Sequence, residues 1–120
     1  MIKILLADDH AAIRKRLRQI LLEGFPDSEI AEVADGNRLV RRSLEGSWDI
    51  VIADIAMPVL SGLEALRRIR VQFPRLPVLL VSIYFEEDFA RFAVAAGASA
   101  YLCKEKAQED LLPIVRSLIV

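Results

Sequence analysis

The chain has 120 residues, of which 54% are hydrophobic, and its formal net charge is −1. This length suits one domain with a single core, and the apolar content excludes a disordered chain. The small charge argues against a domain that binds nucleic acid by electrostatic attraction. The single cysteine cannot form an internal disulfide, and no apolar segment is long enough to span a bilayer. We therefore expect residues 1–120 to form one cytoplasmic domain, without a signal peptide or an output domain.

The first half of the chain alternates short apolar runs with amphipathic segments. Residues 2–6 form an apolar run, which predicts a buried strand, and apolar residues at helical spacing over 13–21 predict a helix. Residues 29–34 predict a second strand, whose two glutamates favour an edge of the sheet. A short helix over 39–44 and a third apolar strand over 49–54 follow, so a strand-helix unit repeats.

The second half continues this alternation. We predict a helix, a strand, a helix, a short strand and a final helix over residues 61–73, 78–82, 86–96, 100–103 and 111–119. Ser61 and Glu64 have the spacing of a capping box, which marks the start of the first of these helices. Phe89, Phe92 and Ala93 lie on the apolar stripe of the next helix, so we expect them to be buried. We interpret three groups of arginines as solvated helix faces, at residues 14–18, 38–42 and 67–70.

Strands that alternate with helices predict a parallel sheet with helices on both faces, joined by right-handed crossovers. The first, third and fourth strands are the most uniformly apolar, so they should lie at the centre, with the second and fifth at the edges. The doubly wound order 2-1-3-4-5 meets both demands. We therefore predict an α/β fold, a flavodoxin-like, doubly wound (βα)5 three-layer sandwich.

Polar residues stand where the predicted strands end. Those that end or follow the first, third, fourth and fifth strands are Asp8 with Asp9, Asp54, Ser82 and Lys104. The carboxyl ends of parallel strands share one edge of the sheet, so these side chains should lie close together. Three carboxylates at one place repel one another unless a cation binds. Oxygen ligands select a hard ion, and we predict Mg²⁺, although Ca²⁺ or Mn²⁺ fits the same ligand types.

A metal ion, an ammonium group and a hydroxyl around one carboxylate form a site for a phosphoryl group. The metal ion and Lys104 would neutralise the phosphoryl oxygens, while Ser82 would donate a hydrogen bond. The Asp54 carboxylate would attack phosphorus in line, and the product would be an acyl phosphate on Asp54. Asp54, Ser82 and Lys104 are therefore the candidate catalytic residues.

These residues resemble the receiver domain of two-component response regulators. The resemblance covers nearly the whole chain and comprises five motifs in the family's order, namely Asp8-Asp9, residues 54–58 with Gly62, Ser82, Gly97-Ala98 and residues 101–104. The sequences ADDH and GASAYL, and Lys104 followed by Glu105, look like the NarL/LuxR-like subfamily. Members of that subfamily usually carry a C-terminal helix-turn-helix domain that binds DNA.

The resemblance implies a role for each matching residue at the site. Asp54 would be the phosphoacceptor, and Lys104 would pair with the phosphoryl group. Asp9 and Asp54 would bind Mg²⁺ directly, together with the main-chain carbonyl of Ala56, while Asp8 would act mainly through water. The donor would be a phosphohistidine on a sensor histidine kinase or a small acyl phosphate. The domain would then be no enzyme in the usual sense, because it would catalyse only its own phosphorylation and dephosphorylation.

The resemblance also implies a switch. Ser82 would bond a phosphoryl oxygen, and Tyr101 would turn inward when Ser82 moves. Phosphorylation would shift an existing equilibrium of the surface formed by the 86–96 helix, the 100–103 strand and the last helix. We expect a phosphorylation-dependent homodimer and control of transcription through an output domain that binds DNA. The domain itself would contact neither nucleic acid nor a membrane.

Other functions fit parts of this pattern. A Mg²⁺ phosphatase with an aspartyl nucleophile usually has a second acid two residues later, where this chain has Ala56. A nucleotide or flavin carrier needs a loop rich in Gly, Ser or Thr after the first strand, where the acid pair stands. A binding module that keeps the fold without phosphorylation is a third alternative, and the presence of Asp54, Lys104 and the acid pair argues against it. We interpret His10 as a loop or helix-start residue beside the acids rather than a catalytic base, and Cys103 as a small buried hydrophobe.

Overall fold

The computed structural model describes residues 1–83 and 87–119, except for the side chains of residues 87–89. Its strands form one parallel sheet in the predicted order, β2-β1-β3-β4-β5. The strands are β1 (Lys3–Ala7), β2 (Glu29–Val33), β3 (Ile50–Asp54), β4 (Val78–Ser82) and β5 (Ala100–Cys103). The helices are α1 (Ala11–Gly24), α2 (Gly36–Glu45), α3 (Gly62–Gln72), α4 (Glu87–Ala95) and α5 (Ala107–Leu118), with the short 3-10 helix η1 (Lys104–Lys106) before α5.

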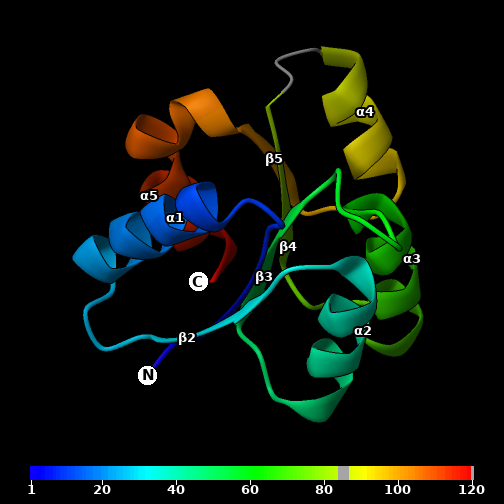
Figure 1. The fold of residues 1–120 in the computed structure, drawn as a ribbon, viewed down its shortest axis with the longest axis horizontal. Coiled ribbons are helices and arrows are strands. Elements are labelled where there is room, and N and C mark those ends of the chain that lie inside the picture. The colour runs from blue at the N-terminus through cyan, green and yellow to red at the C-terminus, as the bar shows by residue number, and fades with distance from the viewer. Residues whose placement is uncertain (84–86, 120) are drawn as a thin grey trace.

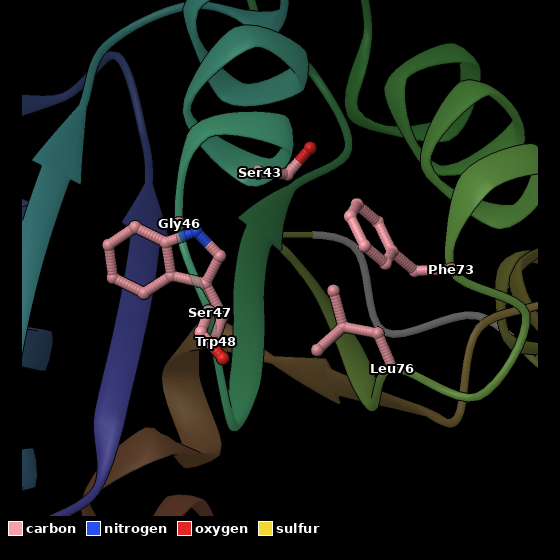
Figure 2. A pocket seen from close by; sticks show the side chains of 6 residues that line it. All are labelled: Ser43, Gly46, Ser47, Trp48, Phe73 and Leu76. Atoms are coloured by element: carbon pink, nitrogen blue, oxygen red, sulfur yellow. The ribbon is translucent and has the colours of Figure 1, made fainter.

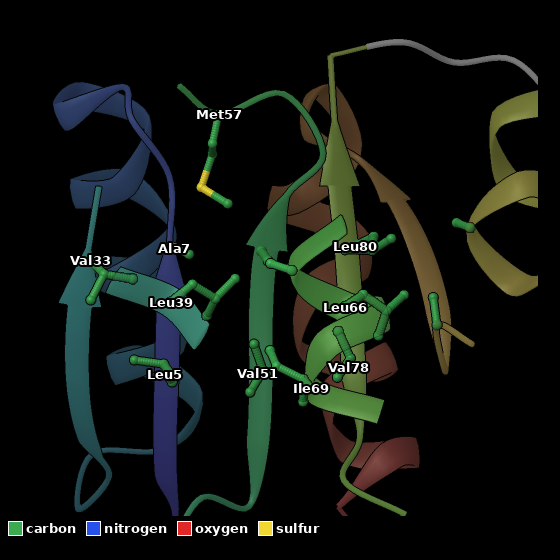
Figure 3. Close-up of a cluster of buried hydrophobic side chains, with 14 residues drawn as sticks. Leu5, Ala7, Val33, Leu39, Val51, Met57, Leu66, Ile69, Val78 and Leu80 are labelled. Atoms are coloured by element: carbon green, nitrogen blue, oxygen red, sulfur yellow. The ribbon is translucent and has the colours of Figure 1, made fainter. Parts of the chain in front are cut away.

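Helices cover both faces of the sheet. Figure 1 shows α1 and α5 on one face and α2, α3 and α4 on the other. Because successive strand residues point to opposite faces, each face has its own hydrophobic cluster. Leu5, Val51 and Leu80 pack under α2, α3 and α4 (Figure 3), whereas Ile52 and Leu79 pack under α1 and α5. Within the described ranges, none of the helices is long and apolar enough to cross a membrane.

Burial differs between central and edge strands. Every residue of β3 and β4 is buried, which fits their uninterrupted apolar sequence. In β2, by contrast, Val33 is the one buried residue. Glu32 of β2 accepts hydrogen bonds from Arg14 at 3.0 Å and from Arg18 at 3.2 Å, both on α1. The predicted edge position of β2 is confirmed.

Two local predictions about side chains have different outcomes. Ser61 is the N-cap of α3, and its hydroxyl accepts a hydrogen bond from the Glu64 N–H at 3.1 Å, as the capping box predicts. The interpretation of the arginine groups as solvated helix faces is wrong for two of their members. Arg14 donates to the Asp8 carbonyl at 2.6 Å, and Arg70 donates to the Gly97 carbonyl at 2.7 Å. A long side chain on a helix can reach the main chain at the end of a neighbouring strand, and amphipathic spacing does not reveal this.

The predicted burial of Phe92 is also wrong. Phe92 is 67% exposed, whereas Ala93 is fully buried against the sheet. Neighbouring residues in a helix point about 100° apart, so the side of α4 that buries Ala93 can leave Phe92 in water. Phe89, which shares the predicted stripe, lies outside the described side chains. At this point α4 packs through a small residue and presents an aromatic ring outward.

Candidate functional site

Asp8, Asp54 and Lys104 meet at the carboxyl edge of the sheet. Asp8 follows β1, Asp54 ends β3, and Lys104 begins η1 directly after β5. The Lys104 Nζ atom lies 2.8 Å from Asp8 Oδ2 and 2.9 Å from Asp54 Oδ2. The side chains are nearly inaccessible, with exposed fractions of 0% for Asp8, 4% for Asp54 and 6% for Lys104. The predicted convergence of these three strand ends is confirmed.

The second oxygen of each buried carboxylate accepts a main-chain hydrogen bond. Asp54 Oδ1 accepts from the Ala56 N–H at 3.2 Å, and Asp8 Oδ1 accepts from the His10 N–H at 2.9 Å. Asp9 is more open, with a side chain that is 31% exposed. Each of four residues offers one ligand atom, and these atoms lie within 4.8 Å of one another, from Asp8, Asp9, His10 and Asp54. The site is therefore a compact cluster that is open on the side of Asp9 and His10.

This donor set suits a hard divalent cation. The ammonium group of Lys104 contacts Asp8 and Asp54, and Asp9 adds a third carboxylate to the cluster, so the cluster keeps an excess of negative charge that a divalent ion would offset. Mg²⁺ is usually bound through a few carboxylate oxygens and retained waters. Asp8, Asp9 and Asp54 are the residues that would hold such an ion. Ala56 is exposed on the adjoining loop, where its main-chain carbonyl is a further candidate ligand.

Burial and charge act in opposite directions on the Asp54 carboxyl group. Burial raises its pKa, because the ionised carboxylate loses hydration. The hydrogen-bonded Lys104 ammonium lowers that pKa without offsetting the burial, and the charge of Asp8 raises it further. For Lys104, burial favours the neutral amine, but its contacts with Asp8 and Asp54 outweigh burial and raise its pKa. Lys104 therefore stays charged, while the ionised form of Asp54 remains costly and gains from further positive charge.

Close main-chain packing holds Asp54 in place. The Gly62 N–H donates to the Ile55 carbonyl at 2.8 Å, which ties the start of α3 to the residue after Asp54. A Cβ atom at Gly62 would lie 2.0 Å from the Asp54 carbonyl oxygen, so a larger residue cannot occupy this position without a shift. Val59, in the same loop, has a φ of 68°, which is strained for a β-branched residue. The loop after Asp54 is therefore tightly packed and locally strained.

Ser82 lies on β4, which pairs with β3, and Tyr101 lies on β5, one strand further. Ser82 ends β4 and is 4% exposed, opposite the buried Cys103 in the register of β5. Asp54 pairs with Val81, so Ser82 lies one residue beyond that pair at the same edge. Tyr101 is half-buried and packs against the cluster under α2, α3 and α4. It pairs with Leu80, so it lies two residues back from Ser82 along the register.

His10 is a member of the cluster that the sequence pattern did not assign to the site. It is the N-cap of α1, which agrees with its interpretation as a helix-start residue. Its ring nevertheless faces the acids, with Nδ1 3.2 Å from Asp9 Oδ1 and 3.4 Å from Asp8 Oδ1. The signal available in the sequence is its place directly after the two aspartates.

A separate pocket lies at the opposite edge of the sheet. Figure 2 shows the residues that line it, which are Ser43, Gly46, Ser47, Trp48, Phe73 and Leu76. Trp48 precedes β3 and Leu76 precedes β4, so the pocket borders the amino ends of these strands. The indole N–H of Trp48 donates to the Arg42 carbonyl at 2.9 Å. None of the lining residues is acidic, basic or a histidine, so this pocket offers neither acid-base groups nor a charged metal ligand.

Comparison with known proteins places the chain in a family. The family model of the response regulator receiver domain matches residues 4–116. The chain belongs to this family. The transcriptional activator protein ExaE of Pseudomonas putida is 37% identical over 116 residues, which cover 97% of this chain and 54% of ExaE. The receiver domain thus spans about half the length of the curated relatives it matches.

Solved structures agree with this assignment. A LuxR-family two-component response regulator from Aurantimonas sp. SI85-9A1 has a TM-score of 0.89 and 31% identity, covering 98% of this chain and 84% of that one. The receiver domain of the sensor histidine kinase PA1611 from Pseudomonas aeruginosa PAO1 has a TM-score of 0.88 and 27% identity, covering 98% and 97%. That structure has a magnesium ion coordinated in its active-site cleft. Receiver domains are regulatory phosphoacceptors that bind Mg²⁺ at an acidic pocket and interact with histidine kinases.

Proposed function

We propose that this receiver domain accepts a phosphoryl group on Asp54 from a sensor histidine kinase, and that Mg²⁺ is required. The observation that carries the proposal is the buried pair of Asp54 and Lys104, 2.9 Å apart, with Asp8 and Asp9 beside it. A buried ion pair is often no more stabilising than apolar residues of similar volume. A pair that also gathers further acids therefore points to a ligand rather than to stability.

The placement of these groups suits phosphoryl transfer. A carboxylate oxygen of Asp54 attacks the phosphorus of a phosphohistidine, and the P–O bond forms as the P–N bond breaks. The electron pair of the broken bond leaves with the imidazole nitrogen, and the product is an acyl phosphate on Asp54. Lys104 then donates to the phosphoryl oxygens, where its charge offsets theirs.

The acids and one carbonyl make up the proposed metal site. Asp9 and Asp54, with the main-chain carbonyl of Ala56, would hold Mg²⁺ directly. Asp8 would act mainly through water, as the likeness to other receiver domains implies. When bound, the ion supplies positive charge against the phosphoryl oxygens.

Phosphorylation acts on the surface formed by α4, β5 and α5. Ser82 donates its hydroxyl to a phosphoryl oxygen, and Tyr101 on the adjacent strand turns inward as Ser82 moves. Support for an interaction surface comes from α4, where Phe92 is 67% exposed and Val94 is 59% exposed. Large apolar side chains that remain in water favour coverage by a partner, and we infer that the phosphorylated domain forms a homodimer.

The regulatory effect of phosphorylation requires an output domain in addition to the receiver domain. We infer that phosphorylation controls transcription through a C-terminal helix-turn-helix domain, on the evidence of ExaE and the LuxR-family neighbour. Residues 1–120 act as one receiver domain in the cytoplasm. With a net charge of −1, this domain binds neither DNA nor a membrane by itself. It catalyses its own phosphorylation and dephosphorylation and is not a turnover enzyme.

Intact mass spectrometry tests this function. The wild-type domain should gain the mass of one phosphoryl group in Mg²⁺ and acetyl phosphate, and the gain should disappear when a chelator removes the ion. Asp54→Ala should gain nothing. Asp27→Ala, which changes an exposed acid before β2, is the matched control and should behave as the wild type does. An undiminished mass gain in Asp54→Ala, or sustained release of phosphate from small esters, would overturn the proposal.

A further inference from the structure

The His10 imidazole is part of the acidic cluster, and the role proposed above for Mg²⁺ does not use it. His10 is the one histidine in the sequence. Its Nδ1 atom lies 3.2 Å from Asp9 Oδ1 and 3.4 Å from Asp8 Oδ1, and His10 is one of the four residues whose ligand atoms lie within 4.8 Å of one another. The side chain is 59% exposed, so the ring can adjust its direction at little cost in burial.

The side chains of Lys104 and His10 face different oxygens of the carboxylates. Lys104 Nζ contacts the Oδ2 atoms of Asp8 and Asp54, at 2.8 and 2.9 Å. The His10 ring instead faces the Oδ1 atoms of Asp8 and Asp9. An ion held from the side of Asp9 would therefore meet carboxylate oxygens and an imidazole nitrogen, while the ammonium group stays on the other side of the acids.

The chemistry of an imidazole ligand distinguishes between cations. Mg²⁺ prefers oxygen ligands, so a nitrogen donor adds little to its affinity. Imidazole suits first-row transition ions such as Fe²⁺, Ni²⁺ and Zn²⁺, whose affinities rise along the Irving-Williams order. We propose that His10 Nδ1 is a ligand of the divalent ion at this site and gives the receiver domain a preference for first-row transition ions over Mg²⁺. This inference rests on the metal site of the proposed function.

Isothermal titration with Mg²⁺ and with Co²⁺ tests this preference, on protein that carries no polyhistidine tag. His10→Asn replaces the nitrogen donor with an amide and should weaken Co²⁺ binding about tenfold, with Mg²⁺ binding nearly unchanged. Asp9→Asn is the matched control and should weaken binding of both ions, because it removes an oxygen ligand. If the ring only formed an ion pair with the acids, its removal would free their oxygens. Unchanged or tighter Co²⁺ binding in His10→Asn would therefore refute the inference.

Proton NMR of the Co²⁺-loaded wild-type domain gives a second readout that needs no variant. A ligated imidazole shows a strongly shifted ring N–H signal that disappears in D₂O. When only the histidine ring carries ¹⁵N, a shifted N–H signal that is split by ¹⁵N can come only from His10, because the sequence contains one histidine. Bound Co²⁺ without this signal would overturn the inference. Phosphorylation of the wild type in Mg²⁺ tests the proposed function separately, so either conclusion can fail without the other.

Discussion

The two edges of the sheet differ in what surrounds their cations. At the carboxyl edge, the Lys104 ammonium contacts the carboxylates of Asp8 and Asp54, with Asp9 and His10 next to them. The charges at this edge do not cancel, and an added cation or phosphoryl group changes which partners Lys104 can have. This edge is therefore suited to exchange one set of contacts for another.

At the amino edge, the guanidinium group of Arg70 on α3 reaches neutral partners. Its Nε donates to the Gly97 carbonyl at 2.7 Å, and its Nη1 donates to the carbonyls of Phe73 at 3.0 Å and of Leu76. Its Nη2 donates to Ser99 Oγ at 3.3 Å. Burial lowers the pKa of Arg70, but a guanidinium group remains charged in proteins. This cation links the end of α3, the start of β4 and the loop before β5.

The comparison of Arg70 with Lys104 shows how the partners of a partly buried cation decide whether it stabilises the fold or favours binding of an ion. Carbonyl dipoles satisfy Arg70 without a surplus of charge, so its contacts need no further ligand. Carboxylates leave a surplus around Lys104, which favours binding of an ion. Substitutions at the two edges should therefore separate stability from ion binding.

Lys104→Met should have the largest effect on stability. Without divalent ions it should lower the free energy of unfolding by about 3–5 kcal/mol, because two buried carboxylates lose the positive charge between them. Mg²⁺ should restore part of this loss, since an ion at a hundredfold excess over its Kd contributes about 2.7 kcal/mol. Denaturant unfolding with and without Mg²⁺ measures both effects. Lys15→Met, at an exposed position of α1, is the control, and an equal loss there would contradict the comparison.

Arg70→Ala should come next. It should lower the free energy of unfolding by about 2 kcal/mol, because several carbonyls lose a charged donor. Titration with Mg²⁺ should give the same Kd as for the wild type, since Arg70 lies at the opposite edge. Arg68→Ala is the matched control on the same helix, where the side chain is 55% exposed and lies 3.9 Å from Glu64. Its effect should stay within about 0.5 kcal/mol. A large change in Mg²⁺ affinity for Arg70→Ala would show that the two edges are coupled.

Asp54→Asn should show how pH acts on the carboxyl edge. The pKa of Asp54 is raised in the folded state by burial, so the folded domain holds this proton more tightly than the unfolded chain does. The contribution of Asp54 to stability is therefore greatest in acid and falls as pH rises through the raised pKa. In chelator at neutral pH, Asp54→Asn should raise the free energy of unfolding by about 1 kcal/mol. Thermal unfolding across pH measures this, and the two proteins should converge in acid. A variant less stable than the wild type at neutral pH would contradict the burial argument.

Val59→Asn should have the smallest effect. Val59 is 82% exposed and has a φ of 68°, a conformation that asparagine adopts more readily than valine. The substitution should stabilise the domain by about 0.5–1 kcal/mol. Val71→Asn is a matched control, since Val71 is 79% exposed in α3, and asparagine and valine have similar helix propensities. Denaturant unfolding of both variants measures the difference, and equal changes would show that Val59 stores no strain.

Much of the fold follows from local patterns. Apolar runs and helical spacing identify the strands and helices, and the uninterrupted apolar sequences of β3 and β4 place them at the centre of the sheet. Parallel topology then brings the ends of β1, β3 and β5 to one edge. Asp8, Asp54 and Lys104 could be assigned to one cluster for this reason, before any distance was known.

The sequence by itself determined the order of the elements, the strand order and the charged residues at the carboxyl edge, because these depend on periodicity and topology. Only the tertiary structure decided that Arg70 reaches the Gly97 carbonyl and that α4 presents Phe92 to water. The physical reason is that these outcomes depend on neighbours from distant parts of the chain. Arg70 and Gly97, for example, are separated by 27 positions, and no local pattern connects them.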